Sequence, residues 1–441
     1  MTLFPIANGF RLHAAMVPDG TFSLTKHTPE SFDLRRDRDG AACLDIDVDV
    51  DGLVCQVTPA DTTRPPEGMI LVAMRGRQVW PGLVDSHAHI DKSHTWARAP
   101  NPDGTLTGAR GAAKRDRAET WQYDEAYRRM DFALRTAFVH GTIAIRTHLD
   151  SQEGRTEPCW SAFLALREAW ADRIALQGTL TLGIAKLLGP WGDRVADWAA
   201  TQGLRLGPVV YDGPGVQAQL DRAFELAEAR GLELDFHVDE TDDPEADGLT
   251  RIAETVLARD FSGRVLCSHA CSLARRPEAA ARATIAKVLE AGIGVISLPM
   301  TNIYLQDRDP LATPRWRGVT LLRELKAAGV AVALAGDNVR DAFHPYGDHD
   351  LLDVFRDAVR LGHLDLPIGD WPRAVTSTPA AMLGLTGRGH ISAGAAADLV
   401  IFEGRDYTEV LARHGRGRIV LRAGRKIVDD LPDYRELDEP A

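Results

Sequence analysis

The chain has 441 residues, 44% of them hydrophobic and 26% charged, which is typical of a folded globular protein and excludes a disordered one. Its 51 basic and 63 acidic residues give a formal net charge of −12. A nucleic-acid partner is therefore not expected, because binding a polyphosphate requires clustered Lys and Arg. The length suits one large barrel with an appended domain.

Five scattered cysteines, an odd number, predict neither a disulfide framework nor a zinc ribbon. No apolar run approaches the roughly 18 residues that cross a bilayer. Residues 1–20 lack the pattern of a signal peptide. We therefore expect a cytoplasmic protein without a membrane partner.

The two ends of the chain share one pattern. In residues 1–75, short β-like runs at 44–50, 53–57 and 69–74 are separated by Asp, Gly and Pro. Short runs separated by Gly return at 397–402, 418–422 and 426–428. We expect segments 1–75 and 390–441 to form two parts of one small β-sandwich domain that flanks a larger domain at 76–389.

From residue 76 onward, short apolar runs alternate with longer segments of helical periodicity. The runs that predict buried strands are 83–89, 142–148, 174–182, 204–212, 232–237, 265–269, 293–299 and 330–336. Eight strands, each followed by a helical segment, predict an α/β fold with a parallel sheet closed into a (β/α)8 barrel of the TIM type. The alternative is an open doubly wound sheet, but the Gly-rich phosphate loop that normally follows its first strand is absent here.

For two segments near the predicted strand ends, we favour a structural interpretation over a functional one. Residues 101–117, rich in Gly, Arg and Lys, could form a lid, but a solvated loop is the default expectation. The triplet Asp348-His349-Asp350 could suggest a metal site, but it lies past the eighth strand, and we interpret it as the cap of a helix start.

Side chains that could ligate a metal follow four of the predicted strands, where a barrel enzyme keeps its chemistry. These residues are His87, His89, His237, Glu240, His269 and Asp337. Residues two apart on a strand point to the same side, so His87 and His89 can converge on one ion. Such residues at four strand ends are much less probable by chance than a lone histidine at one of them.

Three imidazoles and one carboxylate suit a divalent transition metal such as Zn²⁺ or Fe²⁺. His87, His89, His237 and Asp337 make one such set and leave a position for water. A bound metal lowers the pKa of that water towards ~7, which provides hydroxide at neutral pH. Glu240 and His269 then remain beside it as acid–base groups. The pattern indicates metal-assisted hydrolysis.

Several motifs stand in a characteristic order along the chain. They are PGLVDSHAH at 81–89, RTHLD at 146–150, HVDE at 237–240, Ser268-His269, NIYLQDR at 302–308, Asp337-Asn338 and GAAADLV at 394–400. In this order they resemble the amidohydrolase superfamily, and within it the cytosine deaminase-like branch. The resemblance covers the whole barrel, and the last motif is similar to the second half of this superfamily's flanking β domain.

The resemblance implies a role for each residue of the site. The metal ligands would be His87, His89, His237 and Asp337. Glu240 would shuttle a proton to the ring nitrogen of the substrate, and His269 would orient and polarise the hydroxide. Asp337 would also accept a proton from water and help to deliver it to the departing ammonia.

A single metal is expected. Cyclic-amide hydrolases of the superfamily bridge two metals with a carboxylated lysine at the end of the fourth strand. Here that strand ends Val209-Val210-Tyr211-Asp212, without a lysine, and Lys186 lies beyond the third strand.

The identity of the substrate stays open at the level of sequence. Cytosine deaminases read the pyrimidine amide with a glutamine after the third strand, and residues 178–183 hold none. Lys186 or a neighbouring loop could replace it, and Gln306 is another possible ring contact. Asn338 stands where cytosine deaminases have a second aspartate, and Phe343 could form part of the pocket wall.

Three functions follow from these observations. The first is a deaminase that converts a ring C–NH2 of a small N-heterocycle to C=O with release of ammonia. The second is an amidohydrolase that cleaves an alkylamino or cyclic amide C–N bond, because residues 89–93 and 337–341 resemble the triazine hydrolases related to N-isopropylammelide amidohydrolase. The third, ranked last, is a catalytically silent relative that binds a ligand. Self-association is common in this family, so we expect a homo-oligomer.

Overall fold

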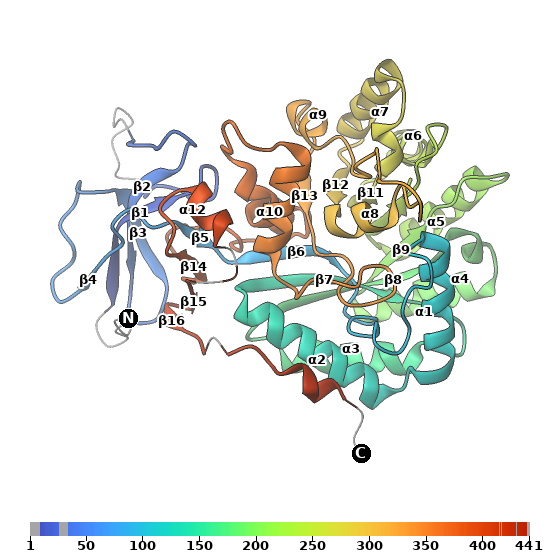
Figure 1. Cartoon of the computed structure of the whole chain (residues 1–441), viewed down its shortest axis with the longest axis horizontal. Helices are drawn as coiled ribbons and strands as arrows, with labels where there is room; N and C mark the ends of the chain where they lie inside the picture. The colour runs from blue at the N-terminus through green and yellow to red at the C-terminus, as the bar shows by residue number, and fades with distance from the viewer. Residues whose placement is uncertain (1–8, 26–33, 414, 416, 429, 439–441) are drawn as a thin grey trace. The chain divides into compact units, whose positions relative to one another are not determined.

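A computed structural model of the chain describes residues 9–25, 34–413, 415, 417–428 and 430–438. Its largest sheet has eight strands in the order β13-β12-β11-β10-β9-β8-β7-β6 (Figure 1). They are β6 (Leu83–Ala88), β7 (Thr142–Asp150), β8 (Ala175–Gly183), β9 (Arg205–Val209), β10 (Leu234–Val238), β11 (Val265–His269), β12 (Gly294–Ser297) and β13 (Val332–Leu334). Each of the eight strands expected from the sequence is present.

The sheet closes between its first and last strands. Ala88 and Asp337 form a parallel bridge. The amide of His89 donates to the Asp337 carbonyl at 3.0 Å, and the Asp337 amide donates to the His87 carbonyl at 2.8 Å. The (β/α)8 barrel predicted from the sequence is therefore confirmed, and its closure holds the backbone of Asp337 against that of His87 and His89.

Helices alternate with the strands of the barrel. They are α1 (Leu106–Thr120), α2 (Tyr123–Val139), α3 (Glu157–Ala169), α4 (Pro190–Gln202), α5 (Val216–Arg230), α6 (Gly248–Arg259), α7 (Glu278–Glu290), α8 (Pro299–Leu305), α9 (Leu322–Ala327) and α10 (Leu351–Gly362). Shorter helical segments are η1 (Ile184–Leu188), η2 (Cys271–Ala274), η3 (Trp371–Val375), α11 (Ser377–Met382), α12 (Tyr407–Ala412) and η4 (Tyr434–Leu437). Among the described residues, no helix is long and apolar enough to span a membrane.

Helix α5 illustrates how the sequence specifies these elements. Val216, Leu220, Ala223 and Ala227 are buried at spacings of three and four, which gives the helix one apolar face. Gly231 follows the helix with φ 64°, and its amide donates to the Ala227 carbonyl. A residue without Cβ takes this left-handed conformation at little cost and ends the helix.

Two smaller sheets come from both ends of the chain. The first, in the order β3-β2-β1-β4, contains β1 (Phe10–Val17), β2 (Ala42–Val48), β3 (Val54–Pro59) and β4 (Ile70–Ala73). The second, in the order β16-β15-β14-β5, contains β5 (Val79–Pro81), β14 (Leu399–Phe402), β15 (Arg418–Arg422) and β16 (Arg425–Lys426). One apolar core joins the sheets, with Leu44 and Ile46 from the first and Leu399 and Ile401 from the second. The expected β-sandwich built from both termini is therefore present.

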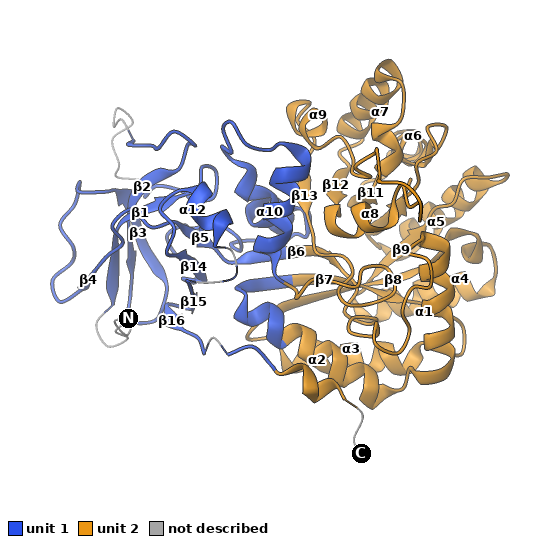
Figure 2. Ribbon diagram, viewed as in Figure 1, with its two compact units in different colours: residues 1–84, 135–144, 350–432 blue, residues 85–134, 145–349, 433–441 orange. Residues whose placement is uncertain are grey.

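By their internal contacts, the residues form two compact units (Figure 2). The first consists of residues 1–84, 135–144 and 350–432, and the second of residues 85–134, 145–349 and 433–441. The domain limits expected from the sequence, at 1–75, 76–389 and 390–441, stay a prediction.

The segment expected to be a solvated loop, residues 101–117, is largely helical, so that prediction was wrong. Thr105 caps α1 by accepting from the Gly108 amide at 3.0 Å. Ala109, Ala112 and Ala113 are buried, so the apolar face of this helix consists of small residues that give a weak sequence signal. The interpretation of the triplet at 348–350 as a cap is confirmed for Asp350, which accepts from the Leu352 amide at 3.0 Å.

Candidate metal centre and active site

The polar residues predicted from the strand ends all belong to one compact unit, and five of them are buried. His87 lies in β6 and His89 directly follows it, while His237 lies in β10. His269 ends β11, and Asp337 follows β13. His269 and Asp337 have positive φ values of 72° and 57°. Such conformations are costly for residues other than glycine and cluster at functional sites, where the surrounding structure holds them.

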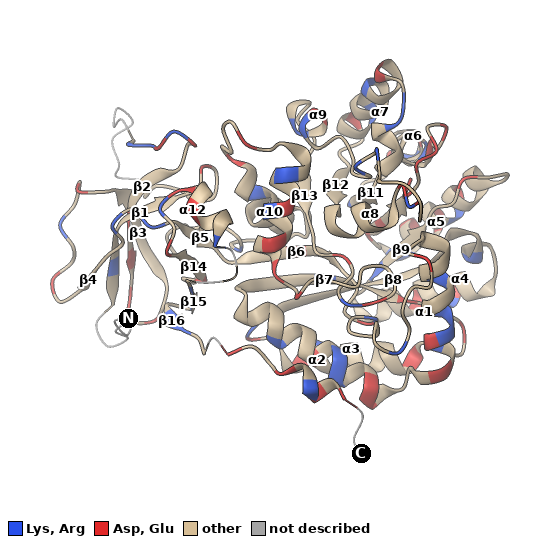
Figure 3. Cartoon of the chain, viewed as in Figure 1, with Lys and Arg blue, Asp and Glu red and all other residues tan. Residues whose placement is uncertain are grey.

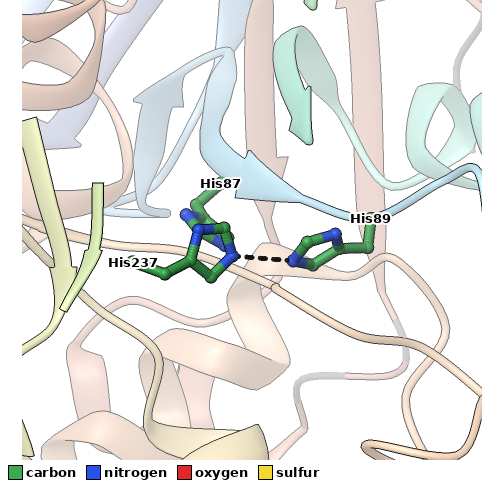
Figure 4. Close-up of side chains that lie close together, drawn as sticks. All are labelled: His87, His89 and His237. Carbon is green, nitrogen blue, oxygen red and sulfur yellow. Dashed lines mark hydrogen bonds between the residues drawn. The ribbon is translucent and has the colours of Figure 1, made fainter. Parts of the chain in front are cut away.

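Figure 4 shows the side chains of His87, His89 and His237 close together. The Asp337 carboxylate lies near the same histidines. His89 Nε2 lies 3.2 Å from His237 Nε2. One carboxylate oxygen of Asp337, Oδ1, lies 3.5 Å from His87 Nε2 and 3.4 Å from His89 Nε2. The structure thus brings together the four residues that the sequence suggested as a ligand set.

Several buried nitrogen and oxygen atoms of this group have no hydrogen-bond partner among the residues that the structure describes. They include His87 Nε2, His89 Nδ1, His237 Nδ1 and both carboxylate oxygens of Asp337. A buried polar atom without a partner carries a free-energy cost unless something else satisfies it. A divalent cation would give His87 Nε2 and the Asp337 carboxylate the partner that they lack, so these residues fit a metal.

The protonation states also suit metal binding. Burial lowers the pKa of His89 and of His237 well below the usual range, which keeps both imidazoles neutral. Burial alone would raise the pKa of Asp337, but the neighbouring His87 and His269 outweigh burial, and the pKa is lowered. Neutral imidazole and ionised carboxylate are the forms that coordinate a metal.

A second cluster of possible ligands shares His87 and includes His148 and Asp235. Asp235 accepts from Arg146 Nη1 at 3.1 Å, so its carboxylate already has a cationic partner. His148 stacks on His87 with ring centroids 3.9 Å apart, and its Nδ1 lies 3.1 Å from Thr181 Oγ1. Neither His148 nor Asp235 lines the pocket described below. We therefore assign this second cluster a supporting role.

Neutral side chains hold the histidines in place, and sequence reasoning missed them. Ser268 Oγ lies 2.8 Å from His87 Nδ1, and Asn302 Nδ2 lies 3.0 Å from His269 Nδ1. Hydrogen bonds to the second ring nitrogen fix the orientation of a histidine. Ser268 and Asn302 stood inside the family motifs, but serine and asparagine occur throughout a chain, and only their neighbours in space reveal the role.

Glu240 is the carboxylate closest to His269. Its Oε1 lies 3.6 Å from His269 Nδ1, and both residues line the same pocket. Burial lowers the pKa of His269, while Glu240 and Asp337 oppose that shift. The site therefore combines a candidate metal set with a carboxylate and an imidazole that can exchange protons.

His89, His237, Glu240, His269 and Asp337 line a pocket of about 420 Å³, and His87 is not among its lining residues. That volume is within the range of small-molecule sites. Three of the substrate contacts suggested by the sequence, Lys186, Asn338 and Phe343, lie in its wall. The fourth, Gln306, is buried at the end of α8 and is not among the lining residues. Asn338 donates to Asp341 Oδ2 at 2.7 Å, so one of its amide hydrogens is already used.

Lys92 is a pocket residue that the sequence did not single out as a contact. Its side chain is buried, with Nζ 3.4 Å from Asp150 Oδ1 and 4.6 Å from the centroid of the Phe343 ring. Arg117 also donates to Asp150. The Lys92 ammonium therefore presents donor hydrogens beside an aromatic wall, which suits a flat heterocycle with carbonyl or ring-nitrogen acceptors.

The barrel and its candidate metal set together indicate a metal-dependent hydrolase. The chain belongs to the amidohydrolase family, which it matches over residues 71–202 and 180–428. It is 47% identical over 390 residues to a pterin deaminase from Rhizobium rhizogenes, and the match covers 88% of this chain and 89% of that protein. The resemblance seen in the sequence is thus confirmed at the level of the family.

Solved structures support the fold. The 5-methylcytosine deaminase of Klebsiella pneumoniae, liganded with 5-fluorocytosine, superposes with a TM-score of 0.80 at 23% identity, covering 96% of this chain and 98% of that one. The N-isopropylammelide isopropylaminohydrolase of Burkholderia multivorans superposes with a TM-score of 0.73 at 24% identity, covering 95% and 98%. At these identities the comparison shows the shared fold.

Proposed function

We propose that the protein is a pterin deaminase, which hydrolyses the C2 amino group of a 2-amino-4-oxopteridine to a carbonyl and releases ammonia. A metal-dependent deaminase of N-heterocycles is the function predicted from the sequence, and the 47% identity to a pterin deaminase supports it. The observation that carries the proposal is the position of Glu240, which lines the same pocket as His89, His237 and Asp337. Deamination of a ring amidine needs such a carboxyl group beside the nucleophile.

The ligands that would hold the metal are His87, His89, His237 and Asp337. We infer one divalent ion, Zn²⁺ or Fe²⁺, because imidazole and carboxylate donors suit both. When bound, the metal supplies Lewis-acid activation of a water molecule at neutral pH.

The protein's own groups account for the proton transfers. Both protons of the attacking water leave its oxygen: one ends on the ring nitrogen and the other on the departing amine, which leaves as ammonia. Glu240 takes the first proton and returns it to the ring nitrogen as the C–O bond forms. Asp337 accepts the second proton and passes it to the amine as the C–N bond breaks.

His269 orients the nucleophile. If the Asn302 amide donates to His269 Nδ1, the proton of the neutral ring is on Nε2. His269 Nε2 is buried and has no partner among the described residues, so its N–H is free to donate to the water or to the oxygen that develops from it. Asn302 thereby selects the tautomer that the reaction needs.

Release of an alkylamine, as in the triazine hydrolases, is the alternative. The structural likeness to the Burkholderia enzyme is one of fold, and the relative with the higher identity is the deaminase. The product separates the two reactions, because only deamination of a C–NH2 group yields free ammonia. We also propose, from the sequence, that the protein is cytoplasmic and a homo-oligomer.

The test is ammonia release by metal-loaded protein. The panel contains pterin, cytosine, 5-methylcytosine, isocytosine, creatinine and an N-alkylaminotriazine, with alkylamine measured in parallel for the triazine. We expect ammonia from pterin with a kcat/KM at least about a hundredfold above that for the pyrimidines, since a site built for one set of polar groups rejects rings that lack them. Ammonia from a pyrimidine alone, or an alkylamine from the triazine alone, would refute the proposal.

A further inference from the structure

The pocket that contains the candidate active site is lined by more basic than acidic side chains. The basic residues are Lys92, Arg110, Lys114, Arg117 and Lys186, and the acidic ones are Asp150, Glu240 and Asp337. The chain as a whole is acidic, with a net charge of −12. The pocket therefore carries more basic than acidic side chains, although the chain as a whole carries more acidic ones. Such a local excess of positive charge favours an anionic ligand.

The acidic residues of the pocket are already engaged. Asp150 accepts from Arg117 and lies 3.4 Å from Lys92 Nζ. Glu240 and Asp337 belong to the reaction centre proposed above. Among the residues that the structure describes, the other three cations, Arg110, Lys114 and Lys186, form no ion pair with any carboxylate.

These three cations come from two elements that border the same pocket. Arg110 and Lys114 are four residues apart on α1, so they share one face of that helix. Figure 3 shows basic residues along α1. Lys186 comes from η1, the segment that follows β8.

The three cations lie towards the outside of the pocket. Lys114 and Lys186 are exposed, whereas Arg110 is half-buried with its guanidinium 4.8 Å from the centroid of the Tyr211 ring. The histidines and Asp337 at the reaction centre are buried. A bicyclic substrate with its amino group at the centre would extend its second ring from there towards the three cations.

We propose that Arg110, Lys114 and Lys186 form an anion-binding subsite at the mouth of the pocket, and that the substrate is a pterin whose second ring carries an anionic substituent, a carboxylate or a phosphate. The inference rests on the proposed deaminase function and specifies its substrate class. The pterin ring is itself uncharged near neutral pH, so it does not account for three unpaired cations. A single exposed ion pair contributes little, but three donors that converge on one anion reinforce each other through charge-assisted hydrogen bonds.

The test compares substrates that differ only in this substituent. We would measure kcat/KM of the metal-loaded enzyme for 6-hydroxymethylpterin, its phosphate ester and pterin-6-carboxylate. We expect at least one anionic substrate to exceed the neutral one by about tenfold, and this advantage to shrink as salt is added. Preference for the carboxylate or for the phosphate identifies which anion the subsite takes.

A double variant tests the residues. Lys114→Ala with Lys186→Ala should lower kcat/KM for the preferred anionic substrate by about tenfold more than for 6-hydroxymethylpterin. Arg115→Ala is the matched control, because Arg115 is an exposed cation on the same helix that does not line the pocket. The Arg115→Ala variant should keep the wild-type ratio of kcat/KM for the anionic substrate to kcat/KM for 6-hydroxymethylpterin.

Two results would overturn the subsite while leaving the deaminase function intact. One is a wild-type kcat/KM that is equal for the anionic and the neutral pterins. The other is a double variant in which kcat/KM falls by the same factor for both kinds of pterin. Absence of ammonia from every pterin is a different outcome, because it refutes the proposed function and the substrate class together.

Discussion

The carboxyl group of Glu240 is the side chain on which the proposed chemistry depends most. Glu240→Gln keeps the size and hydrogen-bonding capacity of the side chain but cannot carry a proton. We expect kcat to fall by about 10²- to 10⁴-fold while the metal content stays at the wild-type level. Ammonia release and elemental analysis of the same preparation measure both quantities. Glu245→Gln, at an exposed glutamate, is the control, and a Glu240→Gln enzyme with near-normal kcat would remove Glu240 from the mechanism.

Asp337 has two proposed duties, as metal ligand and as proton carrier. Its carboxylate is buried beside His87 and His89, and neither oxygen has a hydrogen-bond partner among the described residues. Asp337→Ala should therefore lose metal as well as activity, with a metal content far below one ion per chain after dialysis against buffer without metal. Full occupancy in this variant would show that the ligand assignment is wrong.

In the proposed reaction Asn302 acts through His269, so loss of the Asn302 side chain should affect the rate more than substrate binding. Asn302→Ala is expected to lower kcat by about tenfold, the cost of one buried hydrogen bond, with KM and metal content little changed. Gln306→Ala, four residues later in the same motif, should leave kcat and KM near wild type, because Gln306 does not line the pocket. A raised KM in Gln306→Ala would restore Gln306 as a substrate contact. An unchanged kcat in Asn302→Ala would show that the amide does not position His269.

Apolar periodicity predicts most strands and helices of this protein, because the residues that each element buries leave a regular apolar pattern in the sequence. Each of the eight expected barrel strands either contains the observed strand or has ends that differ from it by one or two residues. For example, the expected strand 204–212 contains β9 (Arg205–Val209). Helix α1 was missed for the opposite reason: its buried side is made of alanines and its other side of Arg and Lys. Its two glycines, Gly108 and Gly111, weaken the helical signal further.

The reaction centre was more accessible to sequence reasoning than its surroundings. Possible metal ligands at four strand ends are improbable by chance, so their pattern suggested a metal set that the fold then brought together. The basic subsite could not be inferred in the same way. Arg110 and Lys186 are 76 positions apart in the sequence. They line the same pocket because α1 and η1 both border it.

The first sheet of the sandwich depends on a buried ion pair. Arg11 in β1 is 1% exposed and donates to both carboxylate oxygens of Asp47 in β2, at 2.6 and 2.7 Å. Arg11→Met would leave Asp47 charged and buried, so we expect the free energy of unfolding to fall by about 3–5 kcal/mol in urea titrations. Adding Asp47→Leu to Arg11→Met should recover part of that loss. A single variant as stable as wild type would mean that water reaches Asp47 and compensates for the missing guanidinium.

Burial of ionisable groups makes the stability of the whole molecule depend on pH in two opposing ways. Burial raises the pKa of Asp85 and of Asp341 to about 7, so the folded chain holds protons there that the unfolded chain has released. Through these two groups, the free energy of unfolding rises as the pH falls from about 7 towards the ordinary pKa of an aspartate, 3.8. Buried histidines act in the other direction, because the folded chain keeps them neutral where the unfolded chain protonates them. The measured curve is their sum, so a single-site comparison is needed to separate one contribution.

His94 is suited to that comparison because it lies apart from the metal set. Burial, and then the nearby His349, Arg340 and Arg129, lower its pKa to about 2. Neither ring nitrogen has a hydrogen-bond partner in the described part of the chain, and the ring packs edge-on against Phe132 with centroids 4.9 Å apart. Phenylalanine can therefore replace it at small steric cost.

Removing this one titration should flatten the acid side of the stability curve. In the unfolded chain His94 has a pKa of about 6.5, so between pH 7 and pH 5 the unfolded state gains a proton that the folded state does not. The stabilising effect of the neutral ring is thus present above pH 6.5 and is lost as the pH falls below it. Urea unfolding of the metal-loaded proteins at the two pH values should show that wild type loses about 2 kcal/mol more than His94→Phe. An equal loss in the two proteins would mean that His94 is protonated in the folded state as readily as in the unfolded one, and the acid sensitivity would then have to come from the histidines of the metal set.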